Sequence, residues 1–236
     1  METSAGHLLD GRIAYVQPRD GYRTGIEPVL LAACVPAQSG QRVLEAGTGA
    51  GAGLLCLAAR VPGVHGVGVE IDPEMAALAR GNLAGASGFA IVTGDVTEDA
   101  LPPVEHAFAN PPWHDPRSTA SPVARRRLAK QGGGLALWVA AMARAVVPGG
   151  TVSLILPAGQ SGPARAALAT AGFGRIVLLP LLPKAGRAAK LVVIQGRGGD
   201  GPAALLAGLV LHEDDGRFTA AADRVLREGG GLLVGS

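Results

Sequence analysis

Aromatic residues, cysteines and long hydrophobic runs are all scarce in this chain of 236 residues. Phe, Trp and Tyr make up only 3% of the sequence, whereas glycine occurs 36 times, so close packing of helices on a sheet must replace bulky core residues. The two cysteines, Cys34 and Cys56, lack zinc-ligand spacing and are expected to be reduced core thiols. No uninterrupted apolar run of about 18 residues is present, which excludes a membrane-spanning helix. We therefore expect a cytoplasmic protein without a membrane partner.

Acidic residues are missing from one long stretch of the chain. No Asp or Glu occurs between Pro116 and Gly199, although the formal net charge of the whole chain is only +2. All 19 acidic residues therefore lie outside a segment that is rich in Lys and Arg. Such an asymmetry is typical of a protein that binds a polyanion, but a run of like charge is as often a solvated face. Charge alone leaves both interpretations open.

Short apolar strands alternate with helices along the chain. The expected strands are 42–46, 64–71, 89–93, 106–109, 151–156, 175–181 and 190–195, and the expected helices are 54–60, 73–83, 135–147 and 162–171. The alternation predicts parallel βαβ units, and the last two strands, joined by the loop 182–189, predict an antiparallel hairpin. We expect one α/β domain over 1–236 with a Rossmann-like, seven-stranded, mostly parallel sheet in residues 38–200. Residues 1–37 and 201–236 are expected to be extensions packed onto it.

A glycine-rich turn, Gly47-Thr48-Gly49-Ala50-Gly51, follows the first of these strands. A turn of this kind lets backbone N–H groups at a helix N-terminus approach a ligand closely. Glu70 ends the next strand, where a carboxylate can hold both hydroxyls of a ribose. The turn alone does not separate a nicotinamide cofactor from S-adenosylmethionine, and tight packing would also explain the glycines.

The residues around the turn resemble the cofactor motifs of class I methyltransferases. Glu45 and the glycines form an E-A-G-T-G-A-G run similar to their motif I. Asp95, followed by Val96, stands at the end of the third strand, where such enzymes place an acid near the adenine amino group. The resemblance favours S-adenosylmethionine, with Glu45, Gly47, Thr48, Gly49, Gly51, Glu70, Asp95, Val96 and Asn110 among its ligands.

The tetrapeptide Asn110-Pro111-Pro112-Trp113 follows the fourth strand and is similar to the N/D-P-P-Y/F/W motif of amino-group methyltransferases. The Asn110 side chain and the Pro111 carbonyl can accept hydrogen bonds from both protons of an exocyclic amine. That favours a pyramidal nitrogen whose lone pair is free to attack a methyl group. Two prolines fix the backbone, and Trp113 offers a face on which a flipped base can stack. The alternative is a rigid Pro-Pro turn with a structural Trp; His114 is a weaker candidate for a proton acceptor.

Nearly the whole chain resembles the bacterial tRNA (adenine-N6)-methyltransferases that modify adenosine 37 of a valine tRNA. The likeness includes Gln17–Glu27, with Glu27 for the usual Asp, and Leu209–Arg227; Trp113 replaces the usual Tyr or Phe. The resemblance implies that Arg23, Thr24 and Gly25 cover the methionine end of the cofactor, that tRNA is the partner and that no metal is needed. Basic residues implied to meet the RNA backbone are Arg125, Arg126, Arg127, Lys130, Lys184, Arg187 and Lys190.

Three alternatives stay open at this point. Guanine-N2 methyltransferases of ribosomal RNA carry a similar motif followed by His, as His114 follows here, but they usually add a second N-terminal domain. Protein glutamine methyltransferases also use an N-P-P motif and usually add an N-terminal helical domain. A non-catalytic nucleotide- or RNA-binding module is the third, although it has no reason to keep Asn110 with two prolines.

Overall fold

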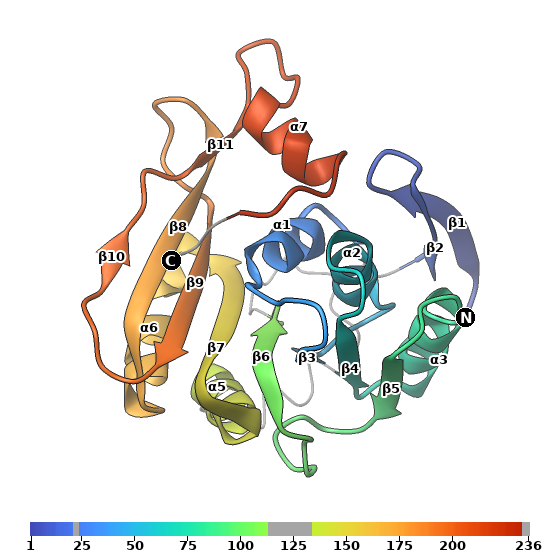
Figure 1. Ribbon diagram of the computed structural model, residues 1–236. Helices are drawn as coiled ribbons and strands as arrows, with labels where there is room; N and C mark the ends of the chain where they lie inside the picture. The colour runs from blue at the N-terminus through green and yellow to red at the C-terminus, as the bar shows by residue number, and fades with distance from the viewer. Residues whose placement is uncertain (21–23, 113–133, 233–236) are drawn as a thin grey trace.

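A mostly parallel β-sheet forms the centre of the protein, in a computed structural model that describes residues 1–20, 24–112 and 134–232 (Figure 1). The strand order is β10-β8-β9-β7-β6-β3-β4-β5, with β11 also paired to β8. Strand β9 runs antiparallel to β7 and β8, and the remaining pairs are parallel. In chain order the strands are β3 (Arg42–Ala46), β4 (His65–Glu70), β5 (Phe89–Thr93), β6 (Val104–Ala109), β7 (Val146–Pro157), β8 (Phe173–Lys184), β9 (Leu191–Gly198), β10 (Ala204–Leu205) and β11 (Leu209–His212).

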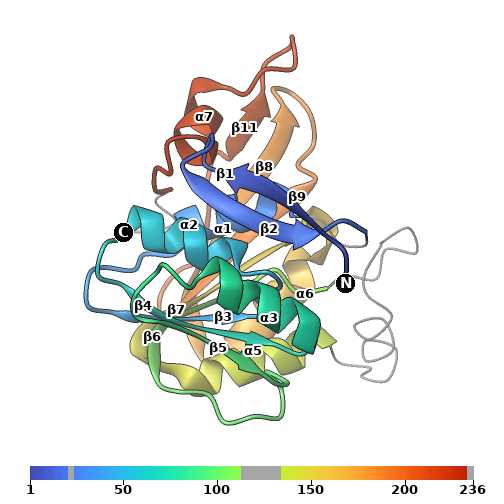
Figure 2. The same cartoon turned by 90° about the vertical axis from the view of Figure 1, so that its right-hand side faces the viewer.

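Helices cover both faces of this sheet. Figure 2 shows α1 and α2 on one side of the strands and α5 on the other. In the described residues the helices are α1 (Glu27–Cys34), α2 (Ala52–Arg60), α3 (Pro73–Asn82), α5 (Gly134–Ala145), α6 (Ser161–Thr170) and α7 (Ala220–Leu226), and η1 (Ala158–Gln160) is a 3₁₀ turn. The α/β class and the alternating pattern predicted from the sequence are confirmed by these elements.

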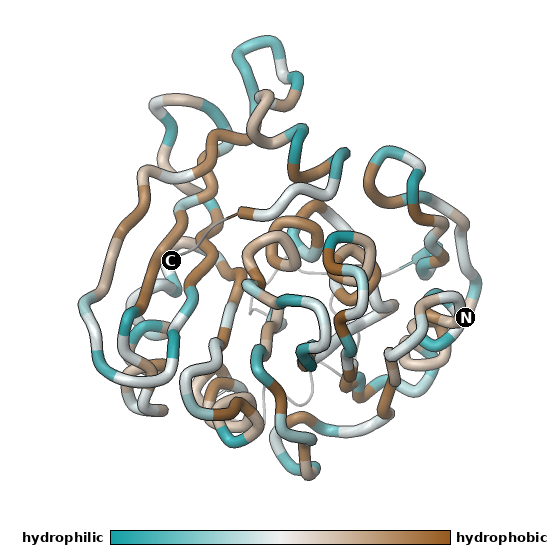
Figure 3. Tube along the Cα trace, in the orientation of Figure 1, coloured by the Kyte–Doolittle hydropathy of each residue, from teal (hydrophilic) through white to brown (hydrophobic). Residues whose placement is uncertain are grey.

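Two hydrophobic cores lie on the two faces because side chains alternate along each strand. On β3, Val43 belongs to the core beneath α1 and α2, whereas Leu44 belongs to the core beneath α5 and α6. On β9, Val193 and Ile194 divide in the same way. The hydropathy colouring shows hydrophobic stretches along the central strands and polar residues in the outer loops (Figure 3). Cys34 and Cys56 are buried and free, and burial raises the pKa of each thiol to about 12.

The two ends of the chain add structure that the sequence pattern did not predict. Strands β1 (Thr3–Leu8) and β2 (Ile13–Pro18) form a separate antiparallel hairpin. Near the C-terminus, β10 and β11 lengthen the predicted seven-stranded sheet to nine strands, both beside β8. Strands of two and four residues are too short for a period-two pattern to reveal them. Whether the chain forms one domain with two extensions stays a prediction.

Several predicted boundaries differ from the observed ones, and β9, for example, continues to Gly198. Pro148-Gly149-Gly150 was expected to separate a helix from a strand, but β7 begins at Val146 and runs through these residues. A register shift between Val104 and His106 accommodates them, and a Cβ at Gly150 would lie 2.2 Å from the Glu105 carbonyl oxygen. The predicted loop 182–189 is shorter as well, because β8 continues to Lys184.

Within the described residues, no helix combines the length and the apolar character that crossing a membrane requires.

A buried histidine near the start of β6 connects this strand to β7 and to Gln41, the residue that precedes β3. The ring of His106 is 4% exposed and lies between the Thr151 hydroxyl, 2.9 Å from Nδ1, and the Gln41 side-chain oxygen, 3.1 Å from Nε2. Burial, helped by the positive charge of Arg197, lowers the pKa of His106 to about 4. The folded protein therefore keeps this ring neutral at a pH where the unfolded chain protonates it.

This depressed pKa predicts a loss of stability in mild acid. Stabilisation by neutral His106 is complete above the ordinary pKa of 6.5 and is lost as the pH falls towards 4. Chemical denaturation of wild type and His106→Gln should show that the wild type loses about 2–3 kcal/mol more between these pH values. His65→Gln, at an exposed histidine, is the matched control and should follow the wild type. Parallel pH profiles of wild type and His106→Gln would contradict the assignment.

Candidate active site

The candidate site lies where the order of strands reverses. The chain winds outward from β3 to β4 and β5 in one direction, and from β6 to β7 in the other. Ligands of open α/β sheets bind at such a switch point, beyond the carboxyl ends of the strands. Ala46 pairs with Ala109, so the next residues, Gly47 and Asn110, leave the sheet at the same level. The glycine turn and the N-P-P motif therefore meet at one crevice.

The glycine turn has a backbone that other residues would strain. Gly47, Gly49 and Gly51 have φ values of 67°, 57° and 87°, in the left-handed region. The Gly47 N–H donates to the Val69 carbonyl at 2.8 Å, and Gly51 is the N-cap of α2. A Cβ at Gly47 would also lie 2.7 Å from the indole of Trp138 on α5. The turn thus brings the N-terminus of α2 close to the crevice.

Two carboxylates hold this turn in place. Glu45 is 6% exposed, and its Oε2 accepts hydrogen bonds from the Thr48 hydroxyl at 2.5 Å and the Leu54 N–H at 3.2 Å. Glu70 accepts a bond from the Gly49 N–H at 2.8 Å with Oε2 and one from the Asp72 N–H at 2.9 Å with Oε1. Burial raises the pKa of both carboxyls, that of Glu45 to about 8. Both residues, which the sequence predicts as direct cofactor ligands, therefore also hold the glycine turn in shape. The motif does not reveal this second role.

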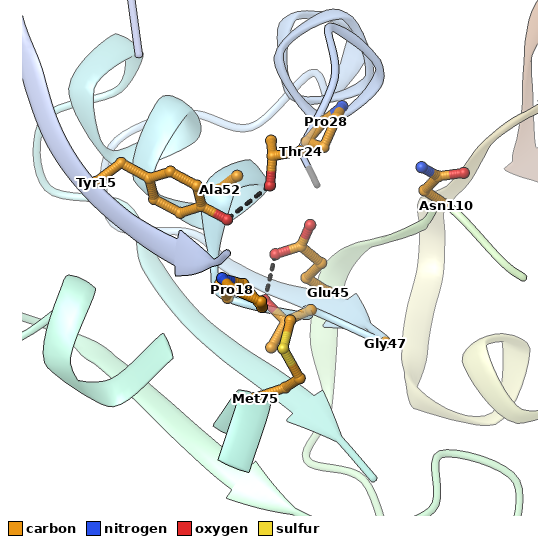
Figure 4. Close-up of a pocket in the computed structure, with 11 residues that line it drawn as sticks. Tyr15, Pro18, Thr24, Pro28, Glu45, Gly47, Ala52, Met75 and Asn110 are labelled. Carbon is orange, nitrogen blue, oxygen red and sulfur yellow. Dashed lines mark hydrogen bonds between the residues drawn. The ribbon is translucent and has the colours of Figure 1, made fainter. Parts of the chain in front are cut away.

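A pocket opens over the turn (Figure 4). It encloses about 450 Å³ when its open mouth is counted. Its lining comes from β2, α1 and the segment before it, the end of β3, the glycine turn with the start of α2, α3, and the residue that follows β6. The lining residues are Tyr15, Pro18, Thr24, Pro28, Glu45, Gly47, Thr48, Ala50, Ala52, Met75 and Asn110. Five residues predicted from the sequence are thereby brought together: Thr24, Glu45, Gly47, Thr48 and Asn110.

Sequence reasoning missed the contribution of β2. Tyr15 is 3% exposed and its hydroxyl lies 2.7 Å from the Thr24 hydroxyl, as Figure 4 shows. Tyr15 is one of only two tyrosines in a chain with few aromatics, which is the one signal that marks it in the sequence. Met75, on the first turn of α3, supplies a flexible apolar wall.

The groups around the pocket suit a ligand with positive charge and hydroxyls. Among the described residues, the lining has no basic side chain and contains the carboxyl of Glu45, three hydroxyls and the Asn110 amide. Beside the turn but outside the lining, Glu70 accepts backbone hydrogen bonds from Gly49, Asp72 and Ile71. A carboxylate has about four acceptor positions, so about one remains for a hydroxyl of a ligand. The described residues hold no group of three or more His, Cys, Asp or Glu placed to bind a metal ion.

Other predicted ligands lie outside the pocket lining. Asp95 follows β5, and its Oδ1 accepts hydrogen bonds from the Thr97 N–H at 2.9 Å and hydroxyl at 2.7 Å. Val96 is 4% exposed within the core beneath α5, so it offers a ligand little surface. Gly25, Gly49 and Gly51 shape the neighbouring backbone without lining the pocket. Arg23 falls outside the described residues.

The N-P-P motif is described as far as Pro112. Asn110 is half-buried and faces the pocket, and Pro111, directly behind it, is buried. Pro112 is partly exposed. Trp113, together with His114, lies outside the described residues, so stacking of a base on its indole stays a prediction.

The predicted RNA-binding residues fall into two groups. Arg125, Arg126, Arg127 and Lys130 lie outside the described residues, whereas Lys184, Arg187 and Lys190 stand at the turn of the β8–β9 hairpin. Ala109 on β6 pairs with Leu154 on β7. Three residues further along β7, Pro157 pairs with Leu191 on β9. Leu191 also pairs with Leu181 on β8. The hairpin therefore extends roughly 20 Å past the level of Asn110, at about 3.3 Å per residue.

Arg187 and Lys190 are exposed on this projection, but Lys184 is engaged elsewhere. Its ammonium group donates to the Asp214 carbonyl at 2.9 Å, within an acidic turn that follows β11. Arg187 and Lys190 are therefore the better candidates for phosphate contacts.

The raised pKa of Glu45 predicts that this residue destabilises the ligand-free protein at neutral pH. The unfolded chain ionises it near 4.5 and the folded chain near 8, so stability falls as the pH rises through this window. Glu45→Gln, which cannot ionise, should be more stable than wild type at pH 8 by about 1–3 kcal/mol, measured by chemical denaturation. Glu98→Gln, at an exposed carboxylate, should show no such gain. A less stable Glu45→Gln protein at pH 8 would argue that the ionised form is favoured.

Comparisons with known proteins connect this geometry to a family. The methyltransferase small domain family matches residues 26–138. The tRNA1(Val) (adenine(37)-N6)-methyltransferase of Aeromonas hydrophila is 29% identical over 216 residues, which cover 85% of this chain and 87% of the relative. The protein of the same name from Tolumonas auensis is 30% identical over 162 residues, or 66% of this chain and 68% of the relative.

Among solved structures, a predicted O-methyltransferase from Agrobacterium tumefaciens superposes with a TM-score of 0.73 at 24% identity. The match covers 87% of this chain and 98% of that one, which confirms the class I methyltransferase fold. The chain belongs to the family of the tRNA1(Val) (adenine(37)-N6)-methyltransferases and is an S-adenosylmethionine-dependent enzyme.

Proposed function

We propose that this enzyme methylates the exocyclic N6 amine of adenosine 37 in a valine tRNA, in the cytoplasm. The observation that carries the proposal is the position of Asn110, which leaves β6 level with the glycine turn and lines the same pocket. The two relatives named for this reaction support the choice of substrate. The glutamine and guanine alternatives have no comparable support in the described residues.

The pocket fits the cofactor of this reaction. S-adenosylmethionine supplies an electrophilic methyl group on a positively charged sulfur, together with an ammonium group and ribose hydroxyls. The carboxyl of Glu45 suits the positive end, and the remaining acceptor position of Glu70 suits a ribose hydroxyl. Binding of a cation next to Glu45 favours its ionised form, which opposes the burial that raises its pKa. Burial of Glu45 would thus lower the stability of the free protein but place a carboxyl where the cofactor binds.

Asn110 and Pro111 would hold the target amine. The amine nitrogen of adenine shares its lone pair with the ring, so it is a weak nucleophile until its geometry changes. The side-chain oxygen of Asn110 and the carbonyl of Pro111 can each accept one of its protons, which directs the lone pair towards the pocket. Both prolines limit backbone motion, so the two acceptors are set before the substrate arrives. The chain needs no general base before transfer, because the extra proton can leave to water afterwards.

Arg187 and Lys190 would contact the phosphate backbone of the RNA. They project beyond the sheet edge that carries Asn110, which is the edge from which an RNA would reach the pocket. Contacts of this kind position the substrate without reading its sequence.

Removing the Asn110 acceptor should slow the chemical step. Asn110→Ala is expected to lower kcat on the order of 10²–10³-fold, as loss of one preorganised transition-state contact does. Asn110→Asp keeps an oxygen acceptor and matches the N/D of the motif, so it should retain much more activity. Single-turnover methylation of tRNA measures both, and calorimetry should find cofactor affinity nearly unchanged. Equal rates for wild type and Asn110→Ala would contradict this mechanism.

Removing the two exposed cations should weaken the salt dependence of RNA binding. Replacing Arg187 and Lys190 by Ala should reduce the slope of log affinity against log salt by about two, because each phosphate contact releases counterions. A matched control replaces Arg144 and Arg197, which have the same total charge but lie near the opposite edge, beside Val146 and Thr151. An unchanged slope in the first variant, or an equal change in both, would mean that the hairpin does not contact RNA.

A further inference from the structure

One side-chain amide connects three separate parts of the structure above the pocket. Asn82, the last residue of α3, accepts a hydrogen bond from the Val16 N–H at 2.9 Å through Oδ1. Its Nδ2 donates to the Val16 carbonyl at 2.8 Å and to the Ala50 carbonyl at 2.8 Å. Two carbonyls on the nitrogen side and one N–H on the oxygen side fix the orientation of the amide. Helix α3, strand β2 and the glycine turn are thereby joined at one point.

Strand β2 carries much of the cover of the pocket. Tyr15 and Pro18 line the pocket directly, and both flank the residue that Asn82 holds. Thr24, another lining residue, is held by the Tyr15 hydroxyl at 2.7 Å and by the Gln17 side-chain oxygen, which accepts from its N–H at 3.0 Å. The position of Thr24 thus depends on β2, and that of β2 depends on Asn82. Ala50, the third partner, lines the pocket from the opposite side.

The hairpin is held at a few other points as well: Tyr15 packs in the core beneath α1 and α2, and the Met1 ammonium group pairs with Glu74 on α3 at 3.2 Å. Strands β1 and β2 form a sheet of their own and do not join the central sheet. At the far end of β2, Arg12 donates to the Glu228 carbonyl and Leu9 packs in the core, so the hairpin turn is attached towards α7. The Asn82 side chain bonds both the N–H and the carbonyl of Val16, as the backbone of a neighbouring strand would.

We propose that Asn82 is a positioning residue for cofactor binding, which sets the affinity for S-adenosylmethionine by holding β2 and the glycine turn at a fixed separation. Asn82 does not line the pocket and would act through Val16, Tyr15 and Ala50. Its loss should therefore raise the dissociation constant of the cofactor while leaving the chemical step, which depends on Asn110, nearly unchanged. The inference rests on the assignment of this pocket to the cofactor.

The test compares Asn82→Ala with Arg80→Ala. Arg80 also lies on α3 and joins it to β5, with bonds to the Thr93 hydroxyl at 2.6 Å and the Ile91 carbonyl at 3.2 Å, away from the pocket lining. Both variants lose hydrogen bonds from the same helix, so both should melt at a lower temperature. Calorimetry with S-adenosylhomocysteine should find binding weakened about tenfold in Asn82→Ala, or 1.4 kcal/mol, and unchanged within about twofold in Arg80→Ala.

A double-mutant cycle with Tyr15→Phe tests the route of the effect. Tyr15→Phe removes the hydroxyl that holds Thr24 and should weaken binding severalfold by itself. If Asn82 acts through β2, the double variant should bind about as weakly as Asn82→Ala alone, because the two changes disturb one path. Additive losses would overturn this route. At saturating cofactor and tRNA, the kcat of Asn82→Ala should stay within about twofold of wild type, as a positioning role in binding requires.

The outcomes distinguish failure of the role proposed for Asn82 from failure of the assignment of the pocket to the cofactor. Equal weakening in Asn82→Ala and Arg80→Ala would reduce Asn82 to a structural residue, and unchanged affinity in both would overturn the proposal directly. If Asn82→Ala does not fold, Asn82→Asp decides, because it keeps the bond from the Val16 N–H and loses both donated bonds. Weaker binding by Asn82→Asp supports the proposal, and wild-type affinity overturns it. Failure of the wild type itself to bind S-adenosylhomocysteine would instead overturn the assignment of the pocket.

Discussion

The buried carboxylate of Glu45 holds the glycine turn between β3 and α2, and the site depends on the shape of that turn. Its hydrogen bonds to Thr48 and Leu54 pull the loop back towards the strand, while Glu70 holds Gly49 from the next strand. An ionised group in this position opposes folding, because burial raises its pKa to about 8. We propose that this carboxyl is placed for the positively charged cofactor, whose binding would favour its ionised form.

The sheet topology brings the remaining groups to this turn. Because the strand order reverses between β3 and β6, the residues that follow Ala46 and Ala109 emerge side by side. The glycine turn and Asn110 are therefore neighbours although about sixty residues separate them in the chain. The β1–β2 hairpin completes the pocket from above, held to α3 by Asn82 and carrying Tyr15 over the cofactor side. In the proposed mechanism, separate elements around one crevice would bind the cofactor and present the amine.

The sequence predicts the fold and the centre of this site well, since both depend on local patterns. Alternating apolar strands and helices, the glycine-rich turn and the N-P-P motif are all visible in the sequence, and they lead to the observed switch point. The hairpin β1–β2 and the partners of Asn82 depend on contacts between distant segments, so no local pattern reveals them. Lys184 illustrates the same limit. The sequence predicts that it contacts RNA, but in the structure its ammonium group donates to the Asp214 carbonyl.

The most direct test of the account is the identity of the methylated product. Purified enzyme, labelled S-adenosylmethionine and unmodified valine tRNA should yield N6-methyladenosine when the RNA is digested to nucleosides and analysed by mass spectrometry. Digestion into defined fragments should place the label at adenosine 37. Label on the guanine N2 amine or on protein, or an RNA without label from an enzyme that binds the cofactor, would contradict the account.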